Sequence, residues 1–213
     1  MKKHWMFAVL LGLLLCMGGI ARAQGADVFV GYSFEQDSFQ NGVGLHGYNL
    51  AGTYNLNPKV GIEANLAGHH GNTTIFETKT SAGTSSTTDK NDIFTFVFGP
   101  KLTHVIGPSN NFEAYTHLLV GGSKVHSSQV FKSGTVVSPG FSIGGRGFAF
   151  ATGGGVDWFH GTWGIRILEM DLVRTTSITS TSSCGTNCTQ KSKVGSATDF
   201  RIASGLIWRF GRS

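Results

Sequence analysis

The amino-acid sequence predicts an all-β protein, an eight-stranded antiparallel up-and-down transmembrane β-barrel with short periplasmic turns and long extracellular loops. Glycine makes up 31 of the 213 residues and phenylalanine 16, while charged residues make up only 14%. This composition disfavours helical bundles, coiled coils and the usual α/β enzymes. Eight segments alternate between apolar and small or polar side chains, which is the period of a strand. The connections between these segments are short and long in turn, as in transmembrane barrels.

The first 23 residues have the organisation of a signal peptide, so we expect a leader (1–23) followed by a barrel domain (24–213). Lys2 and Lys3 precede a short apolar run from Phe7 to Leu15. Ala21-Arg22-Ala23 matches the small-x-small pattern of a cleavage site. The apolar run is too short to act as a membrane anchor.

The exported chain keeps little net charge and two cysteines. The leader contains three basic and no acidic residues, so its removal lowers the net charge from +5 to +2, which gives no reason to expect a nucleic-acid partner. A lipoprotein leader is disfavoured, because Leu15 precedes Cys16 where a small residue is expected. Cys184 and Cys188 remain, and a cysteine pair in an oxidising compartment predicts a disulfide across a tight loop.

The eight alternating segments are joined by three short and four long connections. The short turns lie around Asn57, Ser109 and Gly161. The long connections span 36–44, 69–92, 123–146 and 174–198, and three of them are longer than a compact soluble domain usually carries. The predicted strands are 27–35, 45–55, 60–68, 93–104, 112–122, 147–158, 163–173 and 199–211.

The apolar faces are predicted to point to lipid rather than into a core. A soluble eight-stranded barrel with the apolar set inside is the alternative interpretation of the same pattern. The apolar set is continuous around all eight segments, and aromatic residues gather beside the short turns, as amphipathic rings do at a membrane interface. This predicted aromatic girdle contains Tyr54, Phe112, Trp158, Phe159, Trp163, Trp208 and Phe210.

Charged residues on the other face are predicted to form a polar network in the lumen. An eight-stranded barrel is only wide enough for side chains to fill it, so a salt-bridged plug is favoured over an ion path, which stays the alternative. Arg166 and Glu169 differ in parity, so a β-bulge is expected near Ile167-Leu168; otherwise Arg166 snorkels toward the interface. The predicted lumen set is Glu63, Lys101, Asp157, Arg166, Glu169, Asp171, Arg201 and Arg209.

Four short stretches carry a family resemblance: Val30-Gly31-Tyr32-Ser33-Phe34, Phe98-Gly99-Pro100-Lys101, Gly153-Gly154-Gly155-Val156-Asp157 and Leu206-Ile207-Trp208-Arg209-Phe210. With them the chain resembles the small outer-membrane β-barrel proteins of the OmpA/OmpX type, in particular the glycine-rich "outer membrane protein beta-barrel domain" sequences. The resemblance implies a monomer whose last strand is recognised by the barrel-assembly machinery. It also implies no peptidoglycan-binding domain, because only three residues follow Phe210.

No motif indicates an enzyme, a metal or a cofactor. The run Gly153 to Gly155 lacks the context of a phosphate-binding loop and is better explained by close strand packing. The histidines lie near strand ends without metal-ligand spacing. Ser123, His69 and Asp92 would supply a Ser-His-Asp set, but serine-rich loops provide such triples by chance.

Two long connections are basic, with three cations and no acid in each. We hypothesise that they contact lipopolysaccharide phosphates or an acidic partner; ordinary solvated charge is the alternative. The predicted basic patch comprises Lys124, Lys132, Arg146, Arg174, Lys191 and Lys193. The sequence therefore predicts an integral outer-membrane barrel with a structural or surface-binding role carried by its loops. A narrow channel for small solutes is the alternative function.

Overall fold

The computed structural model describes residues 25–38, 43–80, 83–107, 111–133, 136–183 and 189–211. Within them the chain forms nine strands: β1 (Ala26–Asp37), β2 (Val43–Asn55), β3 (Val60–Thr80), β4 (Gly83–Ile106), β5 (Phe112–Ser133), β6 (Val136–His160), β7 (Trp163–Ser183), β8 (Thr189–Val194) and β9 (Ala197–Phe210). No helix in these segments is long and apolar enough to cross a membrane. The predicted leader and the cysteines Cys184 and Cys188 lie outside the described residues.

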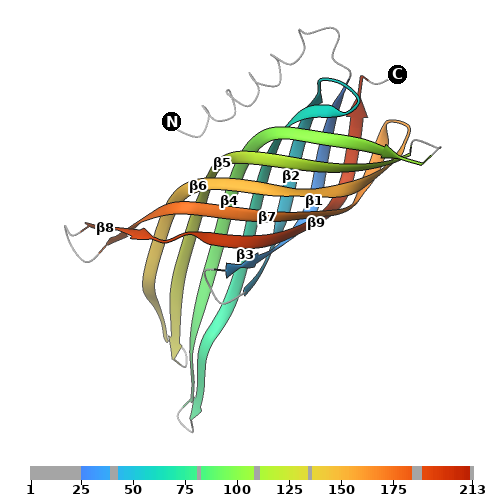
Figure 1. The fold of residues 1–213 in the computed structure, drawn as a ribbon. Helices are drawn as coiled ribbons and strands as arrows, with labels where there is room; N and C mark the ends of the chain where they lie inside the picture. Colours follow the sequence, from blue (N-terminus) through green and yellow to red (C-terminus); the bar gives the residue numbers. More distant parts are fainter. Residues whose placement is uncertain are drawn as a thin grey trace, which may run out of the picture.

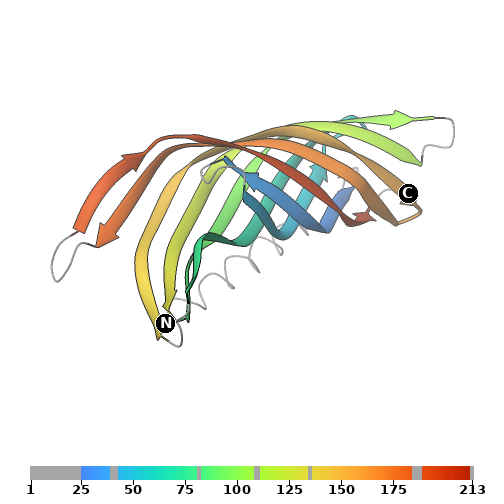
Figure 2. The ribbon, with the colours of Figure 1, turned by 90° about the horizontal axis from the view of Figure 1, so that it is seen from below.

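The strands close into a single antiparallel ring (Figures 1 and 2). Neighbouring strands pair in chain order from β1 to β7, β7 pairs with β9, and β9 pairs with β1. β8 pairs with the far end of β7 and precedes β9, separated from it by Gly195 and Ser196. The ring therefore contains eight strands, β1 to β7 and β9, and β8 lies outside it. The predicted eight-stranded up-and-down transmembrane barrel is confirmed.

The three short connections lie at one end of the barrel, close to the C-terminus (Figure 1). In the β2–β3 turn, Oδ1 of Asn57 accepts hydrogen bonds from the backbone N–H groups of Lys59 and Val60, both at 2.9 Å. In the β6–β7 turn, Gly161 has a φ of +67°, a conformation that glycine adopts at little cost. We refer to the end with these turns as the periplasmic end, as the sequence predicts.

The long connections differ from the prediction, because they are mostly strand rather than loop. β3 to β6 contain 21, 24, 22 and 25 residues, whereas β1 and β2 contain 12 and 13. About ten tilted residues cross a bilayer, so β3–β4 and β5–β6 continue beyond the barrel as long hairpins (Figure 1). The polar composition, rich in Thr and Ser, that predicted loops also suits a β-ribbon with water on both faces.

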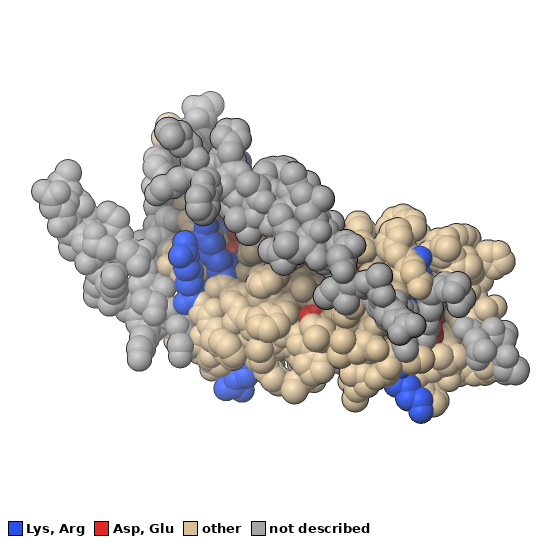
Figure 3. Space-filling model, turned by 90° about the horizontal axis from the view of Figure 1, so that it is seen from above, with Lys and Arg blue, Asp and Glu red and all other residues tan. Residues whose placement is uncertain are grey.

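The strands expose their apolar side chains outward and bury polar ones inside. Val30, Leu50 and Phe96 are 46%, 38% and 47% exposed although they lie in the middle of strands. Glu63 and Arg201 on the inner face are completely buried. This inverts the arrangement of a soluble barrel and matches a lipid-facing exterior. Figure 3 shows one face of the barrel as largely uncharged surface.

Two small apolar clusters complete the lumen between the polar groups. Phe29, Ala51, Phe159, Ala203 and Ile207 form one cluster, and Val97, Leu119, Ala149, Ala151 and Val173 form the other. The inclusion of Phe159 corrects one member of the predicted girdle. Trp158 before it faces outward, so the alternation of the strand turns Phe159 into the lumen, where it is only 5% exposed.

Candidate functional site

The polar lumen begins at the periplasmic end with Arg209 of β9. Its Nε lies 2.8 Å from Oδ1 of Asp27 and its Nη2 lies 2.7 Å from Oε2 of Glu113. The guanidinium carbon stands 3.6 Å from the centre of the Phe159 ring, in the geometry of a cation–π contact. These contacts place one cation between two carboxylates and an aromatic face.

Arg166 of β7 occupies the next position along the lumen. Its Nε donates to Oδ1 of Asp157 at 2.9 Å, and its Nη1 pairs with Oε2 of Glu169. The guanidinium also lies 4.2 Å from the Phe29 ring centre and 4.5 Å from that of Tyr115. The Tyr115 hydroxyl donates to Glu169 at 2.5 Å.

A chain of alternating charges crosses the lumen from β4 to β9. Nζ of Lys101 lies 3.2 Å from Glu63, and Nδ1 of His117 lies 3.0 Å from the other oxygen of Glu63. Nε2 of His117 lies 2.9 Å from Asp171, which accepts a 2.6 Å hydrogen bond from Arg201. His117 therefore bridges two carboxylates, and each carboxylate has a further cation.

The structure places all eight predicted lumen residues on the inner face. Seven are at most 3% exposed, and the Arg209 side chain is 11% exposed. The bulge predicted at Ile167-Leu168 is confirmed: Asp157 pairs with Arg166 but Val156 pairs with Leu168, which leaves Ile167 without a partner in β6. That extra residue lets Arg166, Glu169 and Asp171 all face inward.

Sequence reasoning missed the residues that connect these charges. Glu35 has the same parity in β1 as the buried residues Phe29 and Ser33, so its parity was the signal available. Tyr115 and His117 were hidden because a tyrosine and a histidine have no obligatory side in an alternating strand. The additional inner polar residues include Asp27, Glu35, Asn49, His69, Glu113, Tyr115 and His117.

The structure separates the Ser123, His69 and Asp92 set. Ser123 and His69 are buried inside, whereas Asp92 is exposed outside and pairs with His70. His69 instead lies 2.9 Å from Ser33 Oγ and 3.2 Å from Glu35. This resembles a catalytic triad in composition, but all three side chains are buried, and Ser33 lies within paired β-strand backbone. A hydrolase would need substrate access and free oxyanion donors.

The residues of the predicted basic patch lie on four strands, β5, β6, β7 and β8. Lys124 and Arg146 are direct cross-strand partners near the barrel, whereas Lys132 pairs with Val137 near the tip of the β5–β6 hairpin. Arg174 is exposed on β7 beside Phe150. Lys191 and Lys193 lie on β8, opposite Thr181 and Thr179, and their side chains fall outside what the structure describes.

The remaining girdle residues gather at the periplasmic rim. Trp158 stacks on His160 with ring centres 6.1 Å apart and meets Trp163 edge-on at 5.9 Å. Phe112, Trp163, Trp208 and Phe210 are 40%, 43%, 39% and 57% exposed, and Tyr54 is partly exposed.

Among the described residues, no three His, Cys, Asp or Glu side chains gather as a metal site.

Comparison with solved structures identifies the architecture. A major outer membrane protein from Thermus thermophilus superposes with a TM-score of 0.50 over 87% of this chain and 98% of its own, at 12% identity. The chain has the fold of a small outer-membrane β-barrel. Ail, the attachment invasion locus protein of Yersinia pestis, is similar with a TM-score of 0.49 and 15% identity, over 87% of this chain and 98% of its own. The outer membrane protease OmpT of Escherichia coli is similar with a TM-score of 0.48 and 8% identity, over 91% of this chain and 99% of its own. No family model and no curated protein matches this outer-membrane barrel.

Proposed function

We propose that this protein is a closed outer-membrane barrel that presents its long hairpins as a binding surface outside the cell. The observation that carries the proposal is the pairing of a filled lumen with strands that extend far beyond the lipid-facing band. The barrel anchors the protein in the membrane. The residues that β3 to β6 have beyond the length needed to cross it form the two hairpins.

The lumen argues against the alternative, a narrow channel for small solutes. Arg166 and Arg201 are at most 1% exposed, and both make ion pairs inside the lumen. Moving an ion through this region would require breaking buried pairs, and an unpaired charge in such an environment is costly. The network therefore acts as a plug that holds the strands together.

The hairpins carry exposed apolar side chains beyond the membrane. Phe76 of β3 and Phe131 of β5 both flank Thr87 of β4 in register. They are 60% and 46% exposed, and Val136 of β6 is 62% exposed. Aromatic side chains displayed together on a polar β-ribbon are typical of interaction sites.

Shortened hairpins test the binding role. Thr74 pairs with Thr88 and Ser128 with Ser142, so replacing 75–87 and 129–141 by Asn-Gly turns keeps the barrel register. Cells that display the intact protein should adhere to polystyrene or to dextran sulfate more than cells that lack it. The shortened variant should lose this adhesion, and Phe76→Ser with Phe131→Ser should reduce adhesion to polystyrene alone.

Two controls decide the outcome. A shift in gel mobility between unheated and heated samples shows that the shortened barrel still folds, and a dextran coating controls for nonspecific attachment. Equal adhesion by the intact and shortened proteins would contradict the binding role. Steady single-channel conductance of the intact protein in a planar bilayer would contradict the closed lumen.

A further inference from the structure

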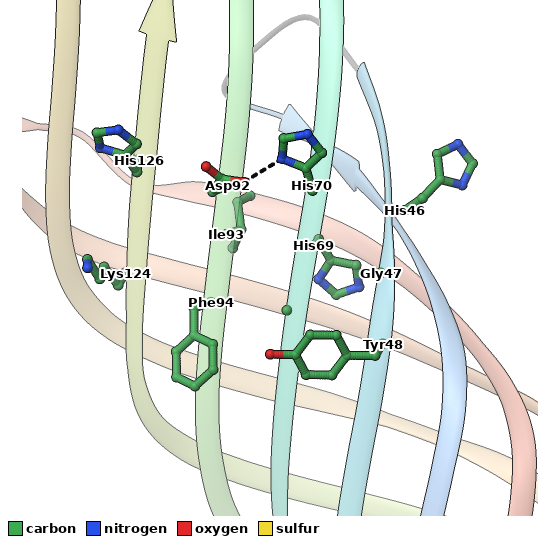
Figure 4. Close-up of a pocket in the computed structure, with 11 residues that line it drawn as sticks. His46, Gly47, Tyr48, His69, His70, Asp92, Ile93, Phe94, Lys124 and His126 are labelled. Atoms are coloured by element: carbon green, nitrogen blue, oxygen red, sulfur yellow. Dashed lines mark hydrogen bonds and ion pairs between the residues drawn. The ribbon is translucent and has the colours of Figure 1, made fainter. Parts of the chain in front are cut away.

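A shallow groove of about 460 Å³ lies on the outer face of β2 to β5 (Figure 4). Its membrane-side wall is aromatic, formed by Tyr48 and Phe94. Its other side is polar and basic, so the groove joins the lipid-facing surface to a set of hydrogen-bonding side chains. That polar set comprises His46, His70, Asp92, Lys124 and His126.

The groove exists because Gly68 stands between two aromatic neighbours. Tyr48, Gly68 and Phe94 are register partners on β2, β3 and β4. A Cβ atom at Gly68 would come within 2.7 Å of the Tyr48 ring, so the ring lies over the glycine. A larger residue at this position would displace Tyr48 and fill the hollow.

The histidines hold defined positions in the groove. Nδ1 of His70 lies 2.5 Å from Oδ1 of Asp92, drawn as the dashed line in Figure 4. Nδ1 of His46 is hydrogen-bonded to the Tyr32 hydroxyl. In both rings Nε2 is the atom left for a ligand, and the carboxylate of Asp92 is an acceptor for hydroxyl groups.

Beside the groove, two cationic side chains lie opposite each other on neighbouring strands, and no described carboxylate pairs with either of them. Lys124 of β5 and Arg146 of β6 are direct register partners, and both are exposed. Like charges directly opposite each other in a sheet are destabilising, and neither side chain forms an ion pair with any described residue. An anion shared by the two cations would relieve this repulsion.

The groove lies where the apolar surface of the barrel ends. On β4 Phe96 follows Phe94 toward the periplasm on the same outward face, and on β6 Phe148 follows Arg146. Lys124 and Arg146 are therefore positioned at the level of the outer-leaflet headgroups, with aromatic side chains immediately below them.

We propose that this groove binds the phosphorylated sugar headgroup of an outer-leaflet glycolipid. Lys124 and Arg146 take a phosphate, the histidines and Asp92 hydrogen-bond sugar hydroxyls, and Tyr48 and Phe94 contact the first part of the acyl chains. The proposal depends on the transmembrane fold and is independent of what the hairpins bind.

Lipid binding to the folded protein in detergent micelles tests the site, with native mass spectrometry as the readout. The probes are diphosphoryl lipid A, its fully dephosphorylated form and phosphatidylglycerol. The intact protein should bind diphosphoryl lipid A at least about tenfold more tightly than either other lipid, since one charge-assisted contact is worth about one factor of ten. Lys124→Gln with Arg146→Gln should remove that preference.

Matched variants separate the site from general charge effects. Lys59→Gln removes an exposed cation at the periplasmic turn and should leave binding unchanged. Gly68→Leu fills the groove without altering charge and should weaken binding of lipid A. Equal binding of phosphatidylglycerol, an equal loss with Lys59→Gln, or unchanged affinity in the Lys124/Arg146 double variant would each overturn the proposal. Because the double variant alters only exposed side chains, it remains informative even where Gly68→Leu fails to fold.

Discussion

Nε of Arg166 lies 2.9 Å from Oδ1 of Asp157, across the ladder between β7 and β6. The pair stands next to the unpaired residue Ile167, which shifts the register so that Glu169 also reaches Arg166. A strand without this bulge would turn either the cation or the carboxylates toward lipid, where charge is costly. The bulge and the ion pairs therefore depend on each other.

Arg166→Met should strongly destabilise the barrel. The substitution leaves Asp157 and Glu169 without their shared cation, and breaking a buried pair by removing one partner costs about 3–5 kcal/mol. Urea unfolding of the barrel in lipid vesicles measures the loss. Arg174→Gln removes an exposed arginine from the same strand and should change the free energy of unfolding by less than about 0.5 kcal/mol. Similar losses for both variants would contradict a structural role for the buried pair.

Deleting Ile167 should prevent correct assembly. The deletion removes the extra residue, so one side of β7 must present its inner residues to lipid. Gel mobility of unheated samples reports the folded fraction. Deleting Ile75 provides the matched control, because a register shift also lies between Thr74 and Phe76, in the β3–β4 hairpin beyond the barrel. A folded barrel after loss of Ile167 would refute the idea that this bulge sets the orientation of Arg166.

Alternation in the sequence predicted the barrel because both faces of each strand carry a clear signal. In β9, Phe200, Ile202 and Leu206 face outward, while Arg201 and Ala203 face inward, as their spacing requires. The bulge was predictable because three charged residues of β7 had to share one face. Parity applied strictly would also have placed Phe159 inside; assigning it to the girdle relied on its proximity to a turn.

The sequence could not predict how the hairpins extend or which charges pair. Residues 69–80 and 83–92 have the composition of a loop, yet they form paired strands because each of the two segments supplies hydrogen-bonding partners to the other. The contact of His117 with both Glu63 and Asp171 depends on the stagger of three separate strands. The outer groove depends in the same way on the register that sets Gly68 between Tyr48 and Phe94.

Gly154→Ala should destabilise the barrel by about 1–3 kcal/mol, the usual cost of overpacking. A Cβ atom at Gly154 would lie 2.2 Å from the carbonyl oxygen of Tyr115, which is backbone and cannot move aside freely. Gly52→Ala is the control, since a Cβ atom there meets nothing within 4 Å. Urea unfolding compares the two variants. Equal free energies of unfolding would show that close strand packing does not explain this glycine run.

Tryptophan fluorescence should report that the periplasmic rim lies at the membrane interface. Trp163 and Trp208 are register partners on β7 and β9, both are exposed, and Trp158 packs against Trp163. In vesicles of brominated lipids, bromines near the headgroup end of the acyl chain should quench this emission more than bromines near the bilayer centre, because indole rings favour the interface. In protein produced without residues 1–23, which contain Trp5, Trp158→Phe with Trp163→Phe leaves Trp208 as the single tryptophan and should keep the same depth dependence. Stronger quenching from the bilayer centre would move the rim into the hydrocarbon and contradict the position of the barrel derived from its aromatic girdle.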